Sequence, residues 1–439
     1  MSPSLHRLNL RTLTMGLAIL AYFMAYFLRV APATLASDFT ADFQTNATAL
    51  GTLAGVYFYV TTAMQVPAGV MVDRLGVRSI LALGCTVAAL GSLTASAAPT
   101  FFWAAIGRLL IGLGTSVLFI AMLKLIAELY PARRFATVAG IAMILGASGS
   151  VVAGAPLGAI IELTSWRLVF VGSTVILAFI ALGSWILIQP SASEAAEPAT
   201  QPSTWASALQ AVIRTPQVLV GFAINCGMTG TFMSFTSLWA VPFLQSHGLT
   251  LGQASMHLSA FFVAFSVASM LIGRLSDAMG NRAALLIGCA TGYTFLLACM
   301  AGLNMNESSA LSYGVFIALG LCTSGFTLTW SQAKDACAPS SAGMAMAVVN
   351  TGGFVCAAVL QPLAGWLMDL RYSSEIAAGT VPHYNASDYQ LCVLVHLVAA
   401  LLGLFAAAVI HFVLRATSIS GAMATEISTA LPTASPEAP

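Results

Sequence analysis

The sequence predicts an all-α membrane protein in which twelve transmembrane helices form two similar bundles of six. Three observations support this fold class. Of the 439 residues, 59% are hydrophobic and only 7% are charged, whereas about 25% are charged in an ordinary soluble domain. Twelve apolar segments approach or exceed about 20 residues, the length that a helix needs to cross a bilayer. One loop motif occurs twice, half a chain apart.

The composition also excludes several classes of protein. A soluble enzyme or a disordered chain needs far more charge to stay dissolved. The formal net charge is +1, which leaves no basic surface for binding nucleic acid. The chain carries no phosphate-binding glycine loop, dinucleotide motif or nucleophile elbow. We therefore expect neither an enzyme nor a bound cofactor or resident metal.

The twelve apolar segments are continuously hydrophobic, which excludes the alternating pattern of a membrane β-barrel. The first segment follows two arginines and resembles a signal peptide, but Arg29 interrupts it and eleven more segments follow, so we expect an uncleaved helix. The segments lie at residues 13–35, 50–72, 79–98, 101–127, 136–161, 167–188, 216–240, 253–275, 283–303, 309–333, 341–368 and 389–414.

A stretch rich in proline, alanine, serine and glutamate separates six segments from six. It predicts a cytoplasmic linker over 189–215, with a short interfacial helix near 205–213. The expected organisation is then an N-terminal bundle over 1–188 and a C-terminal bundle over 216–415. The tail, 416–439, is rich in alanine, serine, threonine and proline and is expected to be disordered.

Lysine and arginine predict the orientation, because cytoplasmic loops carry an excess of both. If both termini are cytoplasmic, eleven basic residues lie on the inner side, and only Arg167 and Arg371 lie on the outer side. The inner group comprises Arg7, Arg11, Arg74, Arg78, Arg133, Arg134, Arg214, Arg274, Arg282, Lys334 and Arg415. We expect this topology in a bacterial inner membrane.

The repeated motif has the form G-x-x-x-D-x-x-G-x-R and follows the second and the eighth segments. The first copy contains Gly69, Asp73, Arg74, Gly76 and Arg78. The second contains Gly273, Asp277, Gly280 and Arg282, with Ala278 where the first has Arg74. A repeat at half the chain length indicates two related bundles.

This duplicated motif, its cytoplasmic position and the central linker resemble those of the major facilitator superfamily over roughly residues 1–415. The resemblance implies transport by alternating access between the two bundles. It also implies that the motif residues act as a gate: the glycines allow close helix contact, and the aspartate and arginine pair at the inner mouth to hold the outward-open state. The second latch is expected to be weaker because Ala278 lacks a charge.

The fourth segment contains Arg108, Gly112 and Gly114 in an arrangement similar to the family's R-x-x-x-G-x-G element. The glutamine that is usual in that element is replaced by Ile111. We therefore assign Arg108 either a coupling or a structural role.

Arg29 is the strongest candidate for binding substrate. Tyr22, Tyr26 and Arg29 have the i, i+4, i+7 spacing that places side chains on one helix face. A central arginine costs about 2.5–3.5 kcal/mol on insertion scales, so it usually faces a cavity and a counter-ion. Organic-anion members of the family carry a similar arginine in their first span. The alternative is an arginine that pairs with Asp38 or reaches the interface.

Further polar residues lie on faces that could line a cavity, although hydrogen bonding between helices explains them equally well. Lys124, in the fourth segment, could bind substrate or pair with Glu128. The others are Asn225, Thr229, Phe232 and Thr236 on the seventh segment, Trp330 on the tenth, and Asn350 and Gln361 on the eleventh.

None of the fifteen acidic residues lies at mid-membrane on these boundaries, whereas three cations, Arg29, Arg108 and Lys124, lie within spans. This imbalance suggests that the substrate supplies the negative charge. We therefore predict a monomeric transporter of a small carboxylate-bearing solute, with the bilayer and the solute as its partners. The alternatives are an exporter of drugs or siderophores, a metal-ion importer suggested by the methionines, and a sensor or assembly partner that has lost transport.

Overall fold

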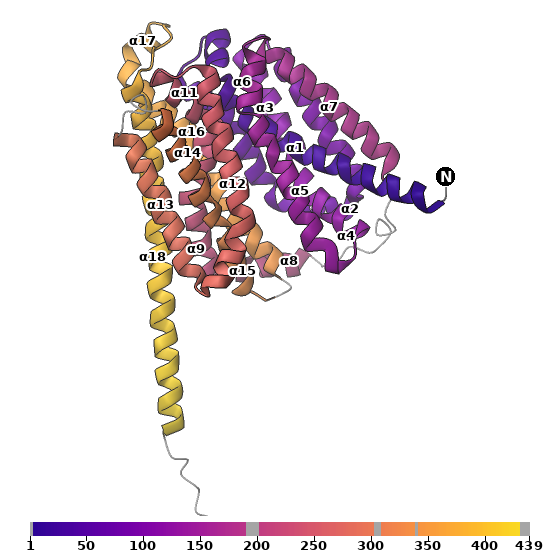
Figure 1. The fold of residues 1–439 in the computed structure, drawn as a ribbon, viewed down its shortest axis with the longest axis vertical. Helices are drawn as coiled ribbons and strands as arrows, with labels where there is room; N and C mark the ends of the chain where they lie inside the picture. Colours follow the sequence, from indigo (N-terminus) through magenta and orange to yellow (C-terminus); the bar gives the residue numbers. More distant parts are fainter. Residues whose placement is uncertain (1–2, 190–201, 303–308, 339–340, 431–439) are drawn as a thin grey trace, which may run out of the picture.

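The computed structural model describes residues 3–189, 202–302, 309–338 and 341–430. Over these residues it is helical, without strands, and its long helices run side by side (Figure 1). Twelve helical stretches are long and apolar enough to cross a membrane. The predicted all-α fold with twelve spans is therefore confirmed.

The first six spans contain seven helices. The second and third spans join into one long helix, while the fourth and fifth are each broken into two. The helices are α1 (Pro3–Phe43), α2 (Ala47–Ser96), α3 (Phe101–Thr115), α4 (Leu118–Leu129), α5 (Ala132–Val152), α6 (Ala155–Ile161) and α7 (Trp166–Leu187).

The second set of spans follows the short helix α8 (Pro202–Ile213), which covers the predicted interfacial segment. The seventh span contains two π-helical turns, labelled η2 and η3, which often mark functional sites. Its elements are α9 (Pro216–Asn225), η2 (Cys226–Gly230), α10 (Thr231–Ser234), η3 (Phe235–Trp239) and α11 (Ala240–Ser246). The others are α12 (Leu251–Met279), α13 (Arg282–Gly302), α14 (Ser309–Thr323), η4 (Ser324–Phe326), α15 (Thr327–Asp335), α16 (Ala342–Asp369), η6 (Leu370–Tyr372), α17 (Ser373–Ala377) and α18 (Ala386–Ala430).

The last helix differs from the sequence expectation. α18 continues to Ala430 and projects well beyond the bundle (Figure 1), although the tail after Arg415 is predicted to be disordered. Alanine is frequent there and the next proline is Pro432, so nothing in the sequence breaks the helix earlier. Part of the predicted linker, 190–201, and the last nine residues, 431–439, lie outside the described residues.

The second glycine of each motif copy occupies a position where the backbone has a positive φ angle. Gly76 has φ 74° and interrupts α2, and Gly280 has φ 62° in the left-handed C-cap of α12. A side chain at either position would strain this conformation. Both copies of the motif therefore turn the chain sharply between two spans.

The two bundles meet through α1, α2, α5 and α6 of the first and η3, α11, α12 and α16 of the second. The closest approach is between α2 and α16. A methyl group on Gly51 would collide with the backbone carbonyl of Gln361, and one on Gly365 would collide with that of Ala47. Small residues thus allow the two helices to touch, as in other membrane bundles.

Candidate functional site

A cavity lies between the two bundles, near the middle of the spans that form it. It encloses about 350 Å³, part of it open to solvent. The first bundle contributes Tyr26, Arg29, Val30 and Ser150, and the second contributes Phe232, Met233, Thr236, Ser237, Phe262, Phe265 and Phe326. Residues of both bundles therefore line one site.

Arg29 supplies the positive charge of this cavity. Its side chain is 9% exposed, and its guanidinium carbon lies 3.9 Å from the centroid of the Tyr26 ring. The Tyr22 hydroxyl donates a hydrogen bond of 3.1 Å to the Tyr26 hydroxyl. The face predicted for α1 therefore forms one cluster, in which the Tyr26 ring fixes the position of the guanidinium.

Arg29 has no carboxylate partner among the described residues, and Asp38, the alternative considered above, does not pair with it. The residues that line the cavity include no acid. A buried cation without a counter-ion is costly. The cavity is therefore electrostatically suited to an anion.

Phenylalanine rings form the opposite wall. Phe265 and Phe326 are nearly parallel, with ring planes 9° apart and centroids 6.1 Å apart. Phe232 lies 5.4 Å from Phe265, with their planes 34° apart, and Phe262 contacts Phe232 edge-on. Of these rings, sequence analysis singled out Phe232 alone, because the others lie on the eighth and tenth spans, and only the fold shows that they face the same cavity.

A chain of polar groups leads from the cavity into the second bundle. Gln361 donates from Nε2 to the Ser237 hydroxyl at 2.8 Å, and the Ser234 hydroxyl lies 2.8 Å from Nε2 of His396. The Gln361 Nε2 also lies 3.4 Å from the Ser234 carbonyl. Gln361, a predicted site residue, thus contacts the cavity wall from behind.

Other predicted binding residues lie outside the cavity lining. Asn225 donates to the Thr329 hydroxyl at 2.6 Å and accepts from Thr229 at 2.8 Å, so this pair joins α9 to α15. Trp330 packs edge-on against Phe326, with ring centroids 5.4 Å apart. Asn350 bridges the bundles, with its Nδ2 atom 3.4 Å from Gln65.

Lys124 lies at the duplicated motif rather than at the cavity. Its Nζ atom is 3.1 Å from the Asp73 carboxylate and 3.0 Å from the Val72 carbonyl. Arg78 stacks on Trp185 at 4.3 Å. The aspartate of the first motif thus pairs with a lysine of α4, instead of the arginine expected from the resemblance.

The second motif also forms an ion pair inside its own bundle. Arg282 at the start of α13 lies 2.7 Å from Asp335 at the end of α15. Neither motif places an ion pair between the two bundles in the described residues.

Arg108 is buried in the first bundle, 2% exposed. It donates from Nη1 to the Leu28 carbonyl at 2.7 Å and lies 5.1 Å from the Tyr57 ring. Its Nε and Nη2 atoms have no hydrogen-bond partner, and it borders an apolar space of about 160 Å³ that α1, α2 and Leu238 of η3 also line. These contacts hold the first span against the third helix.

Contacts between the bundles concentrate at the end where α2 begins. Asp369, at the end of α16, accepts hydrogen bonds from the backbone N–H of Ala47 at 3.2 Å and of Thr48 at 2.9 Å, and also from the Thr48 hydroxyl. It thereby caps the first turn of a helix in the other bundle. Sequence analysis missed this role, because a cap on a helix 321 residues away leaves no local pattern.

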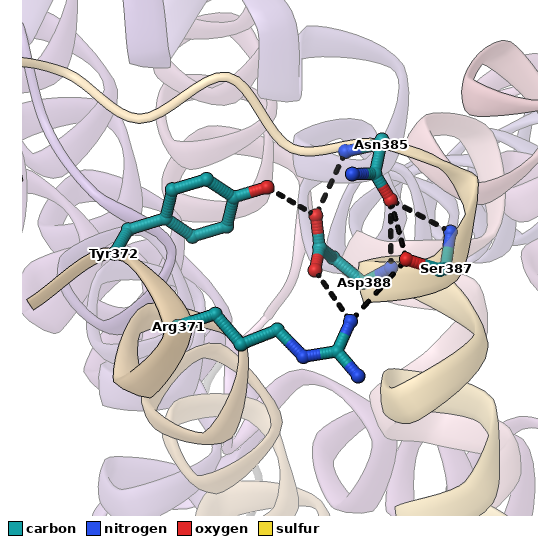
Figure 2. A network of polar contacts seen from close by, with 5 residues as sticks. All are labelled: Arg371, Tyr372, Asn385, Ser387 and Asp388. Carbon is teal, nitrogen blue, oxygen red and sulfur yellow. Dashed lines mark hydrogen bonds and ion pairs between the residues drawn. The ribbon is translucent and has the colours of Figure 1, made fainter.

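Tyr384 completes this contact by donating to Asp369 and accepting from the Ala47 N–H at 2.8 Å. Burial and the neighbouring carboxylate raise the pKa of Tyr384 well above its usual range, so it stays a donor. Figure 2 shows how its loop is held: Asp388 accepts from Arg371 at 3.0 Å, from Tyr372 at 2.7 Å and from the backbone N–H of Asn385 at 2.9 Å.

Two more contacts close the same end. The Ser259 hydroxyl of α12 donates to the Val151 carbonyl and accepts from the Ala155 N–H, both at 2.7 Å. Ser37 of α1 donates to Gln245 of α11 at 3.2 Å. At this end, therefore, three pairs of spans link the bundles through hydrogen bonds.

Two six-span bundles with a shared central cavity define the class of secondary membrane transporters. The sequence profile of the Major Facilitator Superfamily matches residues 18–359 and 226–429. The chain belongs to this family, whose members are transporters and not enzymes.

Relatives and solved structures agree with this assignment. A protein of Agrobacterium vitis named "Putative tartrate transporter" is 25% identical over 405 residues, which cover 84% of this chain and 90% of the relative. The transporter YybO of Bacillus subtilis (strain 168) is 24% identical over 416 residues, which cover 86% of this chain and 92% of the relative.

Among solved structures, a bacterial homologue of the human lysosomal transporter Spinster, in an inward-facing conformation, matches with a TM-score of 0.69 and 16% identity over 91% of this chain and 97% of that chain. The nucleoside transporter NupG matches with a TM-score of 0.72 and 14% identity over 90% of this chain and 99% of that chain. At these identities the likeness concerns the fold.

Proposed function

We propose that this transporter carries a small carboxylate-bearing organic solute, which binds Arg29 in the central cavity. The observation that carries the proposal is a buried guanidinium that lines the cavity and has no carboxylate partner among the described residues. The tartrate named for distant relatives is itself a carboxylate, which supports the same class of substrate.

Alternating access follows from where the bundles touch. The end at which α2 begins is closed by the Asp369, Ser259 and Ser37 contacts. We assign this end to the outside of the cell and both termini to the cytoplasm, on the basis of the basic residues, so the structure represents an inward-facing state. Impermeant thiol reagents should then label a cysteine at exposed Ser387, and not one at Arg134, from outside intact cells.

The gating roles of the duplicated motif stay part of this proposal. Asp73 and Lys124 brace the inner end of the first bundle, and Arg282 and Asp335 brace that of the second. Bracing each bundle separately lets the two move as rigid bodies around the cavity. Arg108 has the same bracing role deeper in the first bundle.

Counterflow in proteoliposomes tests the role of Arg29 directly. A carboxylate should be exchanged and its uncharged amide should not. Arg29→Ala should reduce exchange by roughly 10- to 150-fold, because a charged hydrogen-bonded pair is worth roughly 1.5–3 kcal/mol and the cavity holds no substitute. Arg29→Lys should recover part of it, since lysine lacks the planar fork that matches a carboxylate.

Arg214→Ala is the matched control, because Arg214 is exposed and lies outside the cavity. It should exchange the carboxylate at the wild-type rate. If the amide is carried as well as the acid, or if Arg29→Ala transports normally, then Arg29 is a structural residue and the carboxylate assignment fails.

A further inference from the structure

The two walls of the cavity differ in chemistry. The first bundle provides Arg29 and the hydroxyls of Tyr26 and Ser150, whereas the second provides four phenylalanine rings, a methionine and two small hydroxyl residues. A substrate that spans the cavity meets a charged wall on one side and an aromatic wall on the other. Its own two sides should differ in the same way.

The wall that the first bundle contributes to the cavity carries a single positive charge. Arg29 is the single basic residue that lines the cavity among the described residues. Lys124 is held at Asp73 and Arg108 at the Leu28 carbonyl. A second carboxylate on the substrate would therefore be desolvated without a partner, which is strongly unfavourable.

The two hydroxyl groups with which the second bundle lines the cavity already donate their hydrogen bonds to backbone carbonyls. Thr236 donates to the Phe232 carbonyl at 2.8 Å, and Ser237 donates to the Met233 carbonyl at 2.5 Å. Ser150 is fully buried, and its hydroxyl has no partner, so it can bind one further polar atom. A substrate with several hydroxyls would therefore meet few free donors in the cavity, because Thr236 and Ser237 can only accept further hydrogen bonds.

The aromatic wall suits a flat apolar body. The rings of Phe232, Phe265 and Phe326 lie within 34° of parallel, with centroids 5.4–6.4 Å apart. Phe232 and Phe326 are each at most 5% exposed, and therefore held in place by their neighbours. An apolar ring set against them is removed from water and gains aromatic contacts as well.

We infer that the preferred substrate is a monoanion with a flat apolar body, of the aromatic monocarboxylate class, rather than a hydroxylated dicarboxylate such as tartrate. The carboxylate binds Arg29, and the ring packs on Phe232, Phe265 and Phe326. This inference rests on the proposed function, because it takes the cavity at Arg29 as the substrate site.

A competition assay tests the inference. It measures how strongly benzoate, L-tartrate and benzamide, each added as a competitor, inhibit counterflow in proteoliposomes. Benzoate should compete at least about tenfold better than tartrate, which corresponds to about 1.4 kcal/mol. Phe265→Leu should weaken benzoate by roughly two- to tenfold, since aromatic pairs add about 0.5–1.5 kcal/mol beyond burial. Phe295→Leu is the control, because Phe295 is 65% exposed on α13.

The outcomes separate this inference from the proposed function. If tartrate competes as well as benzoate, and both depend on Arg29, the aromatic class is wrong and the carboxylate role of Arg29 stands. If Phe265→Leu and Phe326→Leu both fold and leave benzoate competition unchanged, the aromatic wall does not bind substrate. If benzamide equals benzoate and Arg29→Ala has no effect, the proposed function fails too.

Discussion

The two ends of the molecule use their aspartates differently. At the end where α2 begins, an aspartate of the second bundle binds the first bundle. At the opposite end, the two aspartates that form ion pairs each bind a cation of their own bundle. Asp369 on α16 caps α2, while Asp73 pairs with Lys124 and Asp335 with Arg282.

At the α2 end, two further ion pairs each lie inside one bundle, Asp42 with Arg167 and Asp388 with Arg371. Among the described residues, Asp369 is therefore the charge there that joins the two bundles, whereas the pairs at the opposite end stiffen each bundle. Of these charged contacts, only that of Asp369 has to break when the bundles separate.

The exposed fractions of Asp369, Asp73 and Asp335 differ between the two ends as well. Asp369 is 7% exposed, whereas the Asp73 side chain is 78% exposed and that of Asp335 is 62% exposed. Exposed ion pairs contribute about 0–1 kcal/mol each, because water screens them. A buried carboxylate that caps a helix contributes more, and its loss should alter the balance of states more strongly.

The largest effect is expected from filling the contact between α2 and α16. Gly365→Val would push against the Ala47 backbone, and overpacking of this kind costs about 1–3 kcal/mol, or roughly 5- to 150-fold in the population of the closed end. In a cysteine-free background, a reporter cysteine at Leu53, which is 3% exposed, should react faster with thiol reagents. Exchange should fall accordingly.

Gly343→Val is the matched control for that variant, because it lies on the same helix with open space around it. It should leave both the labelling rate and exchange near wild type. Equal labelling in the two variants would show that the α2–α16 contact does not close this end.

A smaller effect is expected from Asp369→Asn. An amide keeps the shape but loses the negative charge at the α2 N-terminus, so closure should weaken by about 1–2 kcal/mol, a factor of roughly 5 to 30. Labelling at the Leu53 position should rise and turnover should fall. Asp335→Asn, whose ion pair is exposed and inside one bundle at the opposite end, should change the labelling by no more than about twofold. Unchanged labelling in Asp369→Asn would rule out this latch.

The duplicated motif should give the smallest of these effects. Asp73→Asn removes the Lys124 pair and should slow turnover several-fold, while the melting temperature stays nearly constant. Asp277→Asn should slow it less, since Ala278 removes one charged neighbour from that copy. Steady-state exchange and thermal unfolding measure both variants. Wild-type turnover in Asp73→Asn would count against a gating role for the motif.

Much of the fold was predictable because it depends on local properties of the sequence. The twelve apolar segments predict twelve spans, and the helical spacing places Tyr22, Tyr26 and Arg29 on one face. Both features follow from residues within about one span of one another.

The close helix contact expected of the motif glycines is not found, because a methyl group added at Gly69, Gly273 or Gly280 would meet nothing within 4 Å. Gly76 and Gly280 instead provide a backbone turn with positive φ.

The rest depends on pairs of residues that only the folded bundle brings together. Lys124 meets Asp73 from 51 residues away, and Asp369 meets Thr48 from 321 residues away. Phe326 and Ser150 reach the cavity from different bundles. A single sequence carries no signal for such pairs, so the polar faces of the seventh and tenth spans were equally compatible with a cavity and with helix packing.

Alternating access requires that the end where α2 begins opens during every transport cycle, and a reversible cross-link across this end is the strictest test. Ser37→Cys and Gln245→Cys would place thiols across the two bundles, where the native side chains lie 3.2 Å apart. In a cysteine-free background, a short bifunctional methanethiosulfonate should abolish exchange in the double variant, and a reducing agent should restore it. Each single variant should remain active. Undiminished exchange by the fully cross-linked protein would show that transport does not require this end to open.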